Sequence, residues 1–146
     1  MKIMINVLVF AVLFFASCTK DEPNMPAPAS EKTMQFSIGD KIFTATLEDN
    51  SSAEIFYALL PITLDMNELN GNEKYNYLDT TLPVNNIRPG TIHAGDIMLY
   101  GNNCIVVFYE TFKTSYSYSP IGHINDIRQL KEALGTENIT IKFSKQ

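Results

Sequence analysis

Apolar and polar residues alternate in two neighbouring segments of the chain. In residues 34–38, and again in residues 41–47, apolar side chains recur at every second position, which is the period of a half-buried β-strand. Gly39 and Asp40 lie between the two segments, and such a pair favours a tight turn of two residues. The pattern therefore predicts a β-hairpin over residues 34–47.

Two later segments change to a helical pattern. A first helix is expected to begin at Ser51, which forms a capping box with Glu54, and to end before Pro61. A second helix is expected after Asp126, which would cap its start, with Gly135 as its stop. Both helices are short, and each has one apolar face that would pack against a core.

The rest of the chain reads as short strands separated by turn-forming Gly, Asn and Pro residues. Tyr75 and Tyr77 fall on the same face of one strand, because side chains alternate along a strand. About eight short strands at this close spacing are typical of a β-sandwich or a β-barrel. After the hairpin, the expected strands are residues 62–66, 74–78, 97–100, 104–110, 121–124 and 139–143.

The N-terminal segment has the pattern of an export signal. Residues 3–15 are apolar apart from Asn6, and the stretch is shorter than the roughly 20 residues that a membrane-spanning helix needs. It has the length of a signal-peptide core. Residues 15–18, Phe-Ala-Ser-Cys, resemble the lipobox of bacterial lipoproteins, which implies that Cys18 carries the lipid. A plain secretory signal with a cysteine there by chance is the alternative.

These features divide the chain into three parts. Residues 1–17 form the expected lipoprotein signal peptide, residues 18–32 a lipidated cysteine with a proline-rich linker, and residues 33–146 the folded domain. Lipid on Cys18 would attach the protein to a membrane of the bacterial cell envelope, and the outer membrane is the expected location. Residues 20–22, Lys-Asp-Glu, resemble the surface-export signal of some lipoproteins, although a solvated tether would have the same composition.

The charge balance and the few Cys and His residues argue against several functions. With 16 acidic and 11 basic residues the net charge is -5, so the chain lacks the basic face that nucleic-acid binding requires. There is no His-x-His pair or cysteine cluster, so no metal is expected, and no phosphate-binding glycine loop that would indicate a nucleotide cofactor. Cys104 lies in an apolar run, which predicts a buried, reduced thiol rather than a nucleophile.

The order of the predicted elements resembles that of the cyclophilins, whose barrel is capped by two helices. The sequence resembles a bacterial branch, the small cyclophilin-like domains, more than the cyclophilins in general, and the resemblance runs from Phe36 to Phe143. It implies a mainly β fold: a closed cyclophilin-like β-barrel of about eight strands with two short α-helices. The segments that carry the resemblance are residues 39–41, 44–47, 60–64, 69–74, 90–97 and 114–118.

The catalytic segment of the cyclophilins is matched only in part. In true prolyl isomerases an Arg polarises the substrate prolyl nitrogen and precedes Pro-Gly-Phe; a Gln follows, and Gly-Gly-Asp ends the segment. Residues 88–96 match the Arg, Pro-Gly and Gly-Asp positions, but Thr91 replaces the Phe, and His93 or Ala94 replaces the Gln. The resemblance therefore implies a substrate-facing Arg88 beside an incomplete proline pocket, and no catalytic residue is assigned.

Four residues form the candidate binding site. Arg88 and His93 lie on this segment, and Tyr116 and Tyr118 lie on a serine- and tyrosine-rich loop of the kind that recognition surfaces use. Each residue has a structural alternative: a solvated or acid-paired Arg88, a His93 hydrogen-bonded to Asp96, and tyrosines packed on the barrel.

The sequence is compatible with two functions. The first is a membrane-anchored cyclophilin-like lipoprotein that binds a peptide or small molecule without catalysis. The alternative is a divergent, weak peptidyl-prolyl cis-trans isomerase. Loss of the Phe and Gln positions favours the first.

Overall fold

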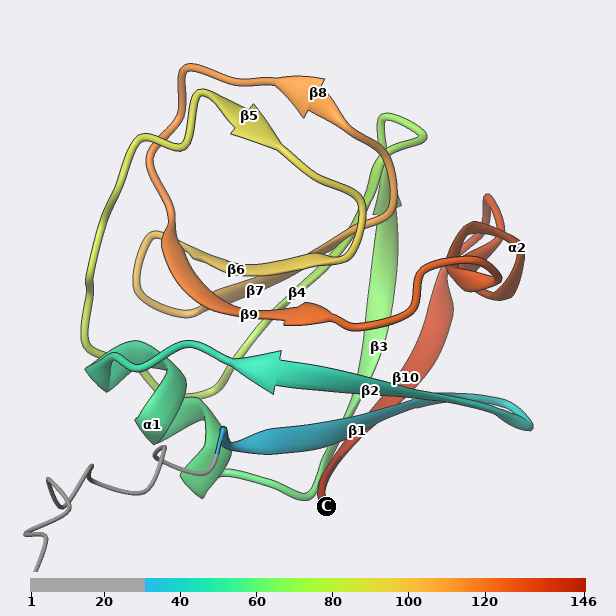
Figure 1. The fold of residues 1–146 in the computed structure, drawn as a ribbon, viewed down its shortest axis with the longest axis horizontal. Helices are drawn as coiled ribbons and strands as arrows, with labels where there is room; N and C mark the ends of the chain where they lie inside the picture. Colours follow the sequence, from blue (N-terminus) through green and yellow to red (C-terminus); the bar gives the residue numbers. More distant parts are fainter. Residues whose placement is uncertain (1–30) are drawn as a thin grey trace, which may run out of the picture.

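The structure, a computed structural model that describes residues 31–146, contains eight strands that close into an antiparallel barrel (Figure 1). These strands are β1 (Thr33–Ile38), β2 (Lys41–Leu47), β3 (Ile62–Leu69), β4 (Glu73–Tyr77), β6 (Asp96–Tyr100), β7 (Cys104–Phe108), β9 (Ser119–Ile124) and β10 (Ile139–Lys145). Their order around the barrel is β1-β10-β3-β4-β7-β6-β9-β2, and the pairing of β2 with β1 closes it. Closure leaves none of these eight strands as an open sheet edge.

Two further strands lie outside the barrel. β5 (Thr91–Ile92) and β8 (Phe112–Lys113) pair only with each other, and Figure 1 shows them set apart from the barrel wall. We call residues 87–95 and 110–118, which contain these strands, the outer layer. It packs on the outward side of β6 and β7 through apolar side chains such as Ile92 and Tyr118.

The predicted architecture is confirmed. β1 and β2 form the expected hairpin with Phe36 opposite Phe43, and β6 and β7 form the second expected hairpin across residues 101–103. Of the two architectures that the strand spacing allowed, the chain adopts the closed barrel. The mainly β fold with two short helices is as the resemblance implied.

Helix α1 (Ser51–Ala58) lies beside one end of β1 and β2 (Figure 1). The predicted cap at Ser51 is wrong by one residue: Asn50 is extended and its Oδ1 accepts a hydrogen bond from the backbone N–H of Ala53 at 2.9 Å. Ser51 is freed for another contact, and its hydroxyl donates to Asn85 Oδ1 at 2.8 Å. Phe56 carries the buried face of the helix.

Helix α2 (Leu130–Leu134) lies on the other side of the barrel and is shorter than expected (Figure 1). The prediction that Asp126 caps it is wrong, because the carboxylate of Asp126 accepts from the backbone N–H of Arg128 at 3.1 Å and closes a local turn before the helix begins. Gly135 ends the helix as expected. Within residues 31–146 no helix is long and apolar enough to cross a membrane.

The barrel interior is packed with aromatic and aliphatic side chains. Phe36 contacts Phe43 and Phe143 edge to face, with ring centroids 5.9 Å and 5.4 Å apart. Phe56 of α1 adds a further edge-to-face contact with Phe143 at 5.6 Å. Such contacts stabilise a core beyond the area that they bury, so α1 closes its end of the barrel through the same aromatic cluster.

Strand β7 is buried on both faces. Ile105 and Val107 point into the barrel core, whereas Cys104, Val106 and Phe108 point outward and are covered by the outer layer. The sequence around Cys104 is therefore continuously apolar rather than alternating. Cys104 is only 4% exposed and forms no disulfide, so its predicted burial is confirmed.

One lysine breaks the apolar pattern of the interior. Lys74 on β4 is 0% exposed, and its ammonium donates to the carboxylate of Glu68 and to the backbone carbonyls of Gly135, at 3.1 Å, and Glu137, at 2.6 Å. The hydroxyl of Tyr109 donates to the same Glu68 carboxylate at 2.8 Å. Burial raises the pKa of Glu68, but the hydrogen bonds from Lys74 and Tyr109 outweigh burial and hold it below its ordinary value.

This charged cluster joins parts of the chain that are distant in sequence. Glu68 comes from the end of β3, Lys74 from β4, Tyr109 from the residue after β7, and the two carbonyls from the connection between α2 and β10. The backbone N–H of Gly71 also donates to Glu68 at 2.8 Å, which fixes the turn between β3 and β4.

We expect Lys74→Met to lower the free energy of unfolding by about 3–5 kcal/mol, because it leaves the partly buried Glu68 carboxylate without its cation. Denaturant unfolding at neutral pH measures the loss. The double variant Lys74→Met/Glu68→Gln should recover part of it, since the unpaired charge is then gone.

The matched control is Lys41→Met. Lys41 pairs with Glu132 at 3.4 Å on the surface, so its loss should cost less than about 1 kcal/mol. Equal effects of the two lysine substitutions would contradict a structural role for the buried cluster.

Candidate functional site

The outward faces of β4, β7 and β6 form the floor of a pocket. The strand register places Tyr77 opposite Cys104, and Cys104 opposite Tyr100, in one row across the three strands. Tyr75 lies opposite Val106 in the next row. Because side chains alternate along a strand, Glu73 must share the outward face of β4 with both tyrosines.

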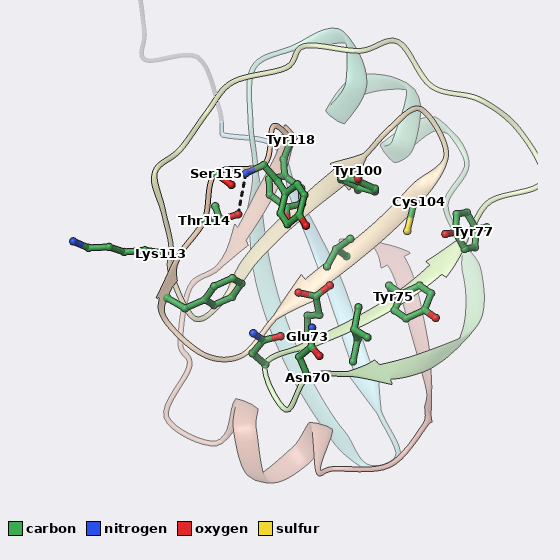
Figure 2. A pocket seen from close by; sticks show the side chains of 15 residues that line it. Asn70, Glu73, Tyr75, Tyr77, Tyr100, Cys104, Lys113, Thr114, Ser115 and Tyr118 are labelled. Carbon is green, nitrogen blue, oxygen red and sulfur yellow. Dashed lines mark hydrogen bonds between the residues drawn. The ribbon is translucent and has the colours of Figure 1, made fainter.

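The outer layer and the turn between β3 and β4 supply the walls. The backbone of Tyr118 is held by two hydrogen bonds to Ile87, at 2.8 Å and 3.0 Å. Tyr116 packs nearly perpendicular to Tyr100, with ring centroids 6.1 Å apart, and its backbone N–H donates to the Thr114 hydroxyl at 3.1 Å (Figure 2). The tip of the tyrosine-rich loop is therefore fixed against β6.

We call this cavity the tyrosine pocket. Its volume is about 490 Å³, and five of the seven tyrosines of the chain line it. The lining residues are Leu69, Asn70, Asn72, Glu73, Tyr75, Tyr77, Tyr100, Cys104, Val106, Phe112, Lys113, Thr114, Ser115, Tyr116 and Tyr118.

Burial and the charge of Glu73 together shape the electrostatics of the tyrosine pocket. Burial, followed by repulsion from the Glu68 charge, raises the pKa of Glu73. Burial and the charge of Glu73 raise the pKa of Cys104 to about 11, and the same two causes raise that of Tyr118. Cys104 is therefore a neutral thiol at physiological pH, and the arrangement has no activated nucleophile.

The structure divides the four predicted site residues into two pairs. Tyr116 and Tyr118 line the tyrosine pocket, whereas Arg88 and His93 do not. Arg88 is exposed and makes no ion pair within residues 31–146, but it directly follows Ile87, the backbone partner of Tyr118. Arg88 therefore lies in the same outer layer as the tyrosines.

His93 takes part in a local turn. Its backbone N–H donates to Asp96 Oδ2 at 2.8 Å, while its exposed ring nitrogen Nδ1 lies 3.9 Å from that oxygen. Gly95 between them has a φ of 99°, and a side chain there would come within 2.7 Å of Ile127. The Gly-Asp pair that matches the cyclophilin pattern thus shapes the entry into β6.

Sequence reasoning missed the floor of the tyrosine pocket. It placed Tyr75 and Tyr77 on one face but did not connect them with Tyr100 or with the loop at Tyr116. The alternation in residues 73–77 was the available signal, since it also puts a carboxylate beside the two rings. Which strands lie beside β4 follows from the barrel order, and that was not visible in the sequence.

The tyrosine pocket is suited to hydrogen bonding and not to metal coordination by the described residues. Within residues 31–146, no group of three or more His, Cys, Asp or Glu side chains lies close enough to hold a metal ion. Apart from Cys104, the polar groups of the tyrosine pocket are hydroxyls, amides, one carboxylate and one ammonium, which suit hydrogen bonding and charge pairing.

The sequence and the fold agree on a family. Residues 36–144 match the model of the Cyclophilin-like family, so the chain belongs to that family. Among solved structures it is similar to the solution structure of the hypothetical protein AF2241 from Archaeoglobus fulgidus, with 14% identity and a TM-score of 0.56. That match covers 84% of this chain and 100% of the other, and at this identity it shows the fold alone. No curated protein matches the chain.

We expect Cys104 to react slowly with iodoacetamide in the native protein at pH 8. With a pKa of about 11, roughly one thiol in a thousand is ionised, against about one in four for an ordinary cysteine. Mass spectrometry of the Cys104 peptide follows the reaction separately from any other thiol.

Glu73→Gln should accelerate this labelling, because it removes the charge that disfavours the thiolate. Glu132→Gln, which removes an exposed carboxylate on α2, should leave the labelling rate of Cys104 unchanged. Labelling of native Cys104 as fast as in denatured protein would contradict its burial.

Proposed function

We propose that this protein is a lipid-anchored cyclophilin-like domain of the bacterial cell envelope that binds a peptide or a small molecule in the tyrosine pocket. The observation that carries the proposal is the tyrosine pocket itself. Its volume of about 490 Å³ lies within the roughly 300–1,000 Å³ that is typical of ligand sites.

The composition of the tyrosine pocket supports recognition. Tyrosine offers a large apolar ring and a polar hydroxyl, and it loses little conformational entropy when a ligand fixes it. Tyr77 and Tyr116 stand at the rim, 60% and 61% exposed, while Tyr118 is buried deeper. A ligand could thus cover the exposed rings, which free protein leaves in contact with water.

Non-catalytic binding is favoured over prolyl isomerisation. Arg88, the residue that would polarise a prolyl nitrogen, does not line the tyrosine pocket, and Thr91 stands where the isomerases have an apolar Phe. Thr91 is paired with Lys113 in the outer layer instead. None of the residues that match the isomerase pattern therefore lines the tyrosine pocket.

The anchor is proposed from the sequence. Cys18 lies outside the described residues, and the support for its lipidation is the lipobox-like segment at residues 15–18 that follows a short apolar run. Two or more acyl chains bind a bilayer far more stably than one. The folded domain would then meet the membrane through the linker alone.

We expect the envelope form of the protein to carry an acylated N-terminal Cys18. Intact-protein and peptide mass spectrometry of the membrane fraction would measure the added acyl mass. Cys18→Ser should remove it, whereas Cys104→Ser should not. An unmodified chain that remains in the aqueous fraction would contradict the anchor.

We expect ligands of the tyrosine pocket to change the intrinsic fluorescence of the full-length protein. The chain has no tryptophan, and five of its seven tyrosines line the tyrosine pocket, so the emission reports mainly on this site. Titration with a library of random hexapeptides and a library of small fragments would find binders. Tyr77→Ala and Tyr116→Ala should each weaken binding by roughly ten-fold, the loss that truncating an aromatic contact residue produces.

Ile42→Ala is the matched control, since Ile42 is exposed but lies outside the tyrosine pocket, and it should leave affinity unchanged. Two outcomes would contradict the proposal: no library member alters the emission, or a proline peptide is turned over rapidly and the rate falls in Arg88→Ala.

A further inference from the structure

Among the residues that the structure describes, none pairs with the Glu73 carboxylate. It is half-buried in the tyrosine pocket, and Figure 2 shows its carboxylate among the lining side chains, between Tyr75 and Tyr118. No hydrogen bond or ion pair reaches it from any side chain in residues 31–146, whereas the nearby Glu68 accepts from Lys74, Tyr109 and Gly71. Removing a carboxylate from water is costly unless a donor or cation compensates.

Within residues 31–146, no basic side chain pairs with Glu73. Lys113 is the one basic residue that lines the tyrosine pocket, and Figure 2 shows its ammonium directed away from the cavity. Lys74, the neighbour of Glu73 in sequence, is on the opposite face of β4 and is fully engaged by Glu68 and two carbonyls. The Glu73 carboxylate thus faces the cavity without a positive side chain beside it.

The aromatic rings of the tyrosine pocket are also free of cations. Outside it, Tyr57 lies under Lys32 and Lys145, each 5.2 Å from the ring centroid, and Tyr109 lies under Lys74 at 5.4 Å. Within the described part of the chain, no lysine or arginine lies over any of the five pocket tyrosines. A cation over such a ring is attracted by its electron-rich face, and the attraction strengthens as water is excluded.

The rings stand in two perpendicular pairs. Tyr75 and Tyr77 meet at 85° with centroids 6.1 Å apart, and Tyr100 and Tyr116 meet at 84° at the same separation. Each pair forms a corner, and the two pairs line one cavity together with Glu73. This combination of aromatic corners and a carboxylate suits a compact positive group.

One further acceptor lies beside Glu73. The side-chain oxygen Oδ1 of Asn72 is buried and has no hydrogen-bond donor within residues 31–146, and Asn72 lines the same pocket. Buried acceptors are nearly always satisfied in folded proteins. A ligand that brings N–H donors would complement this end of the cavity better than one that brings acceptors.

We propose that the tyrosine pocket takes a cationic group, the primary ammonium or guanidinium of a ligand, seated between the tyrosine rings and paired with Glu73. The inference rests on the proposed binding function and gives its ligand a chemical class. The positive group is supplied either by a lysine or arginine side chain of a peptide or by a free organic amine.

The test uses tyrosine fluorescence of the full-length protein and four probes. Two are the peptides acetyl-Gly-Lys-Gly-amide and acetyl-Gly-norleucine-Gly-amide, which differ in the positive charge at the end of one side chain. The other two are pentylammonium and pentan-1-ol, the corresponding pair of free small molecules. The comparison within each pair isolates the charge, and the comparison between pairs separates the two sources.

We expect the lysine peptide to bind at least ten-fold more tightly than the norleucine peptide, the size expected for a charged hydrogen bond in a partly buried site. Glu73→Gln should abolish that preference without lowering the thermal midpoint of the protein, because it removes a half-buried charge. Glu132→Gln, which removes a carboxylate far from the pocket, should retain the preference. Saturation by pentylammonium as well would show that a free amine suffices.

Equal binding of the charged and neutral probes, or a preference for the lysine peptide that survives Glu73→Gln, would overturn the inference. Failure of all four probes would overturn it too. These results would not contradict the proposed binding function itself. That proposal would be contradicted only if the hexapeptide and fragment libraries also yielded no ligand.

Discussion

The buried ammonium of Lys74 is the constraint on which the rest of the structure depends. An ion inside a barrel is tolerated only when its neighbours compensate its charge; here the Glu68 carboxylate pairs with Lys74, two backbone carbonyls accept its other hydrogen bonds, and Tyr109 donates to Glu68. Because these groups come from β3, the residue after β7 and the connection between α2 and β10, the charge can be satisfied only when the barrel is assembled. A single side chain thus links strands and loops that are distant from one another in the sequence.

The same lysine decides what β4 presents on its outward face. A slip of one residue in the pairing of β4 would turn Lys74 outward and carry Tyr75 into the core, where the cluster around Glu68 would lose its cation. With the register held, Glu73, Tyr75 and Tyr77 all point outward, toward the outer layer. The charge network inside the barrel and the tyrosine pocket outside it are therefore two consequences of one strand register.

Local sequence patterns predicted the fold well where neighbouring residues determine the structure. The alternation in residues 34–47 and the two tyrosines at 75 and 77 were interpreted correctly. The helix starts were less certain, because Asn50 and Ser51 are both good caps and only the backbone shows which one is extended. At Asp126 a tight turn competed with the helix and prevailed.

The candidate site was only half visible for a different reason. Tyr116 and Tyr118 stand out by composition, whereas the floor opposite them comes from β4 and β7, which are brought together by pairings between distant segments. Lys74 was overlooked because a lysine between Glu73 and Tyr75 is typical of the solvent-facing side of a strand. In the barrel the two faces of β4 have the opposite roles. Its outward face is covered by the outer layer, and its inward face carries the lysine that pairs with Glu68.

The two-sided character of β4 has a consequence for how such a domain can diversify. The residues that hold the barrel together and those that line the pocket alternate along one strand, so they are neighbours in sequence but separated by the thickness of the sheet. Exchanging the outward aromatic residues would alter what the cavity accepts while the interior stays intact. The scaffold is therefore suited to evolving, or being engineered toward, new ligands by substitution on a single face.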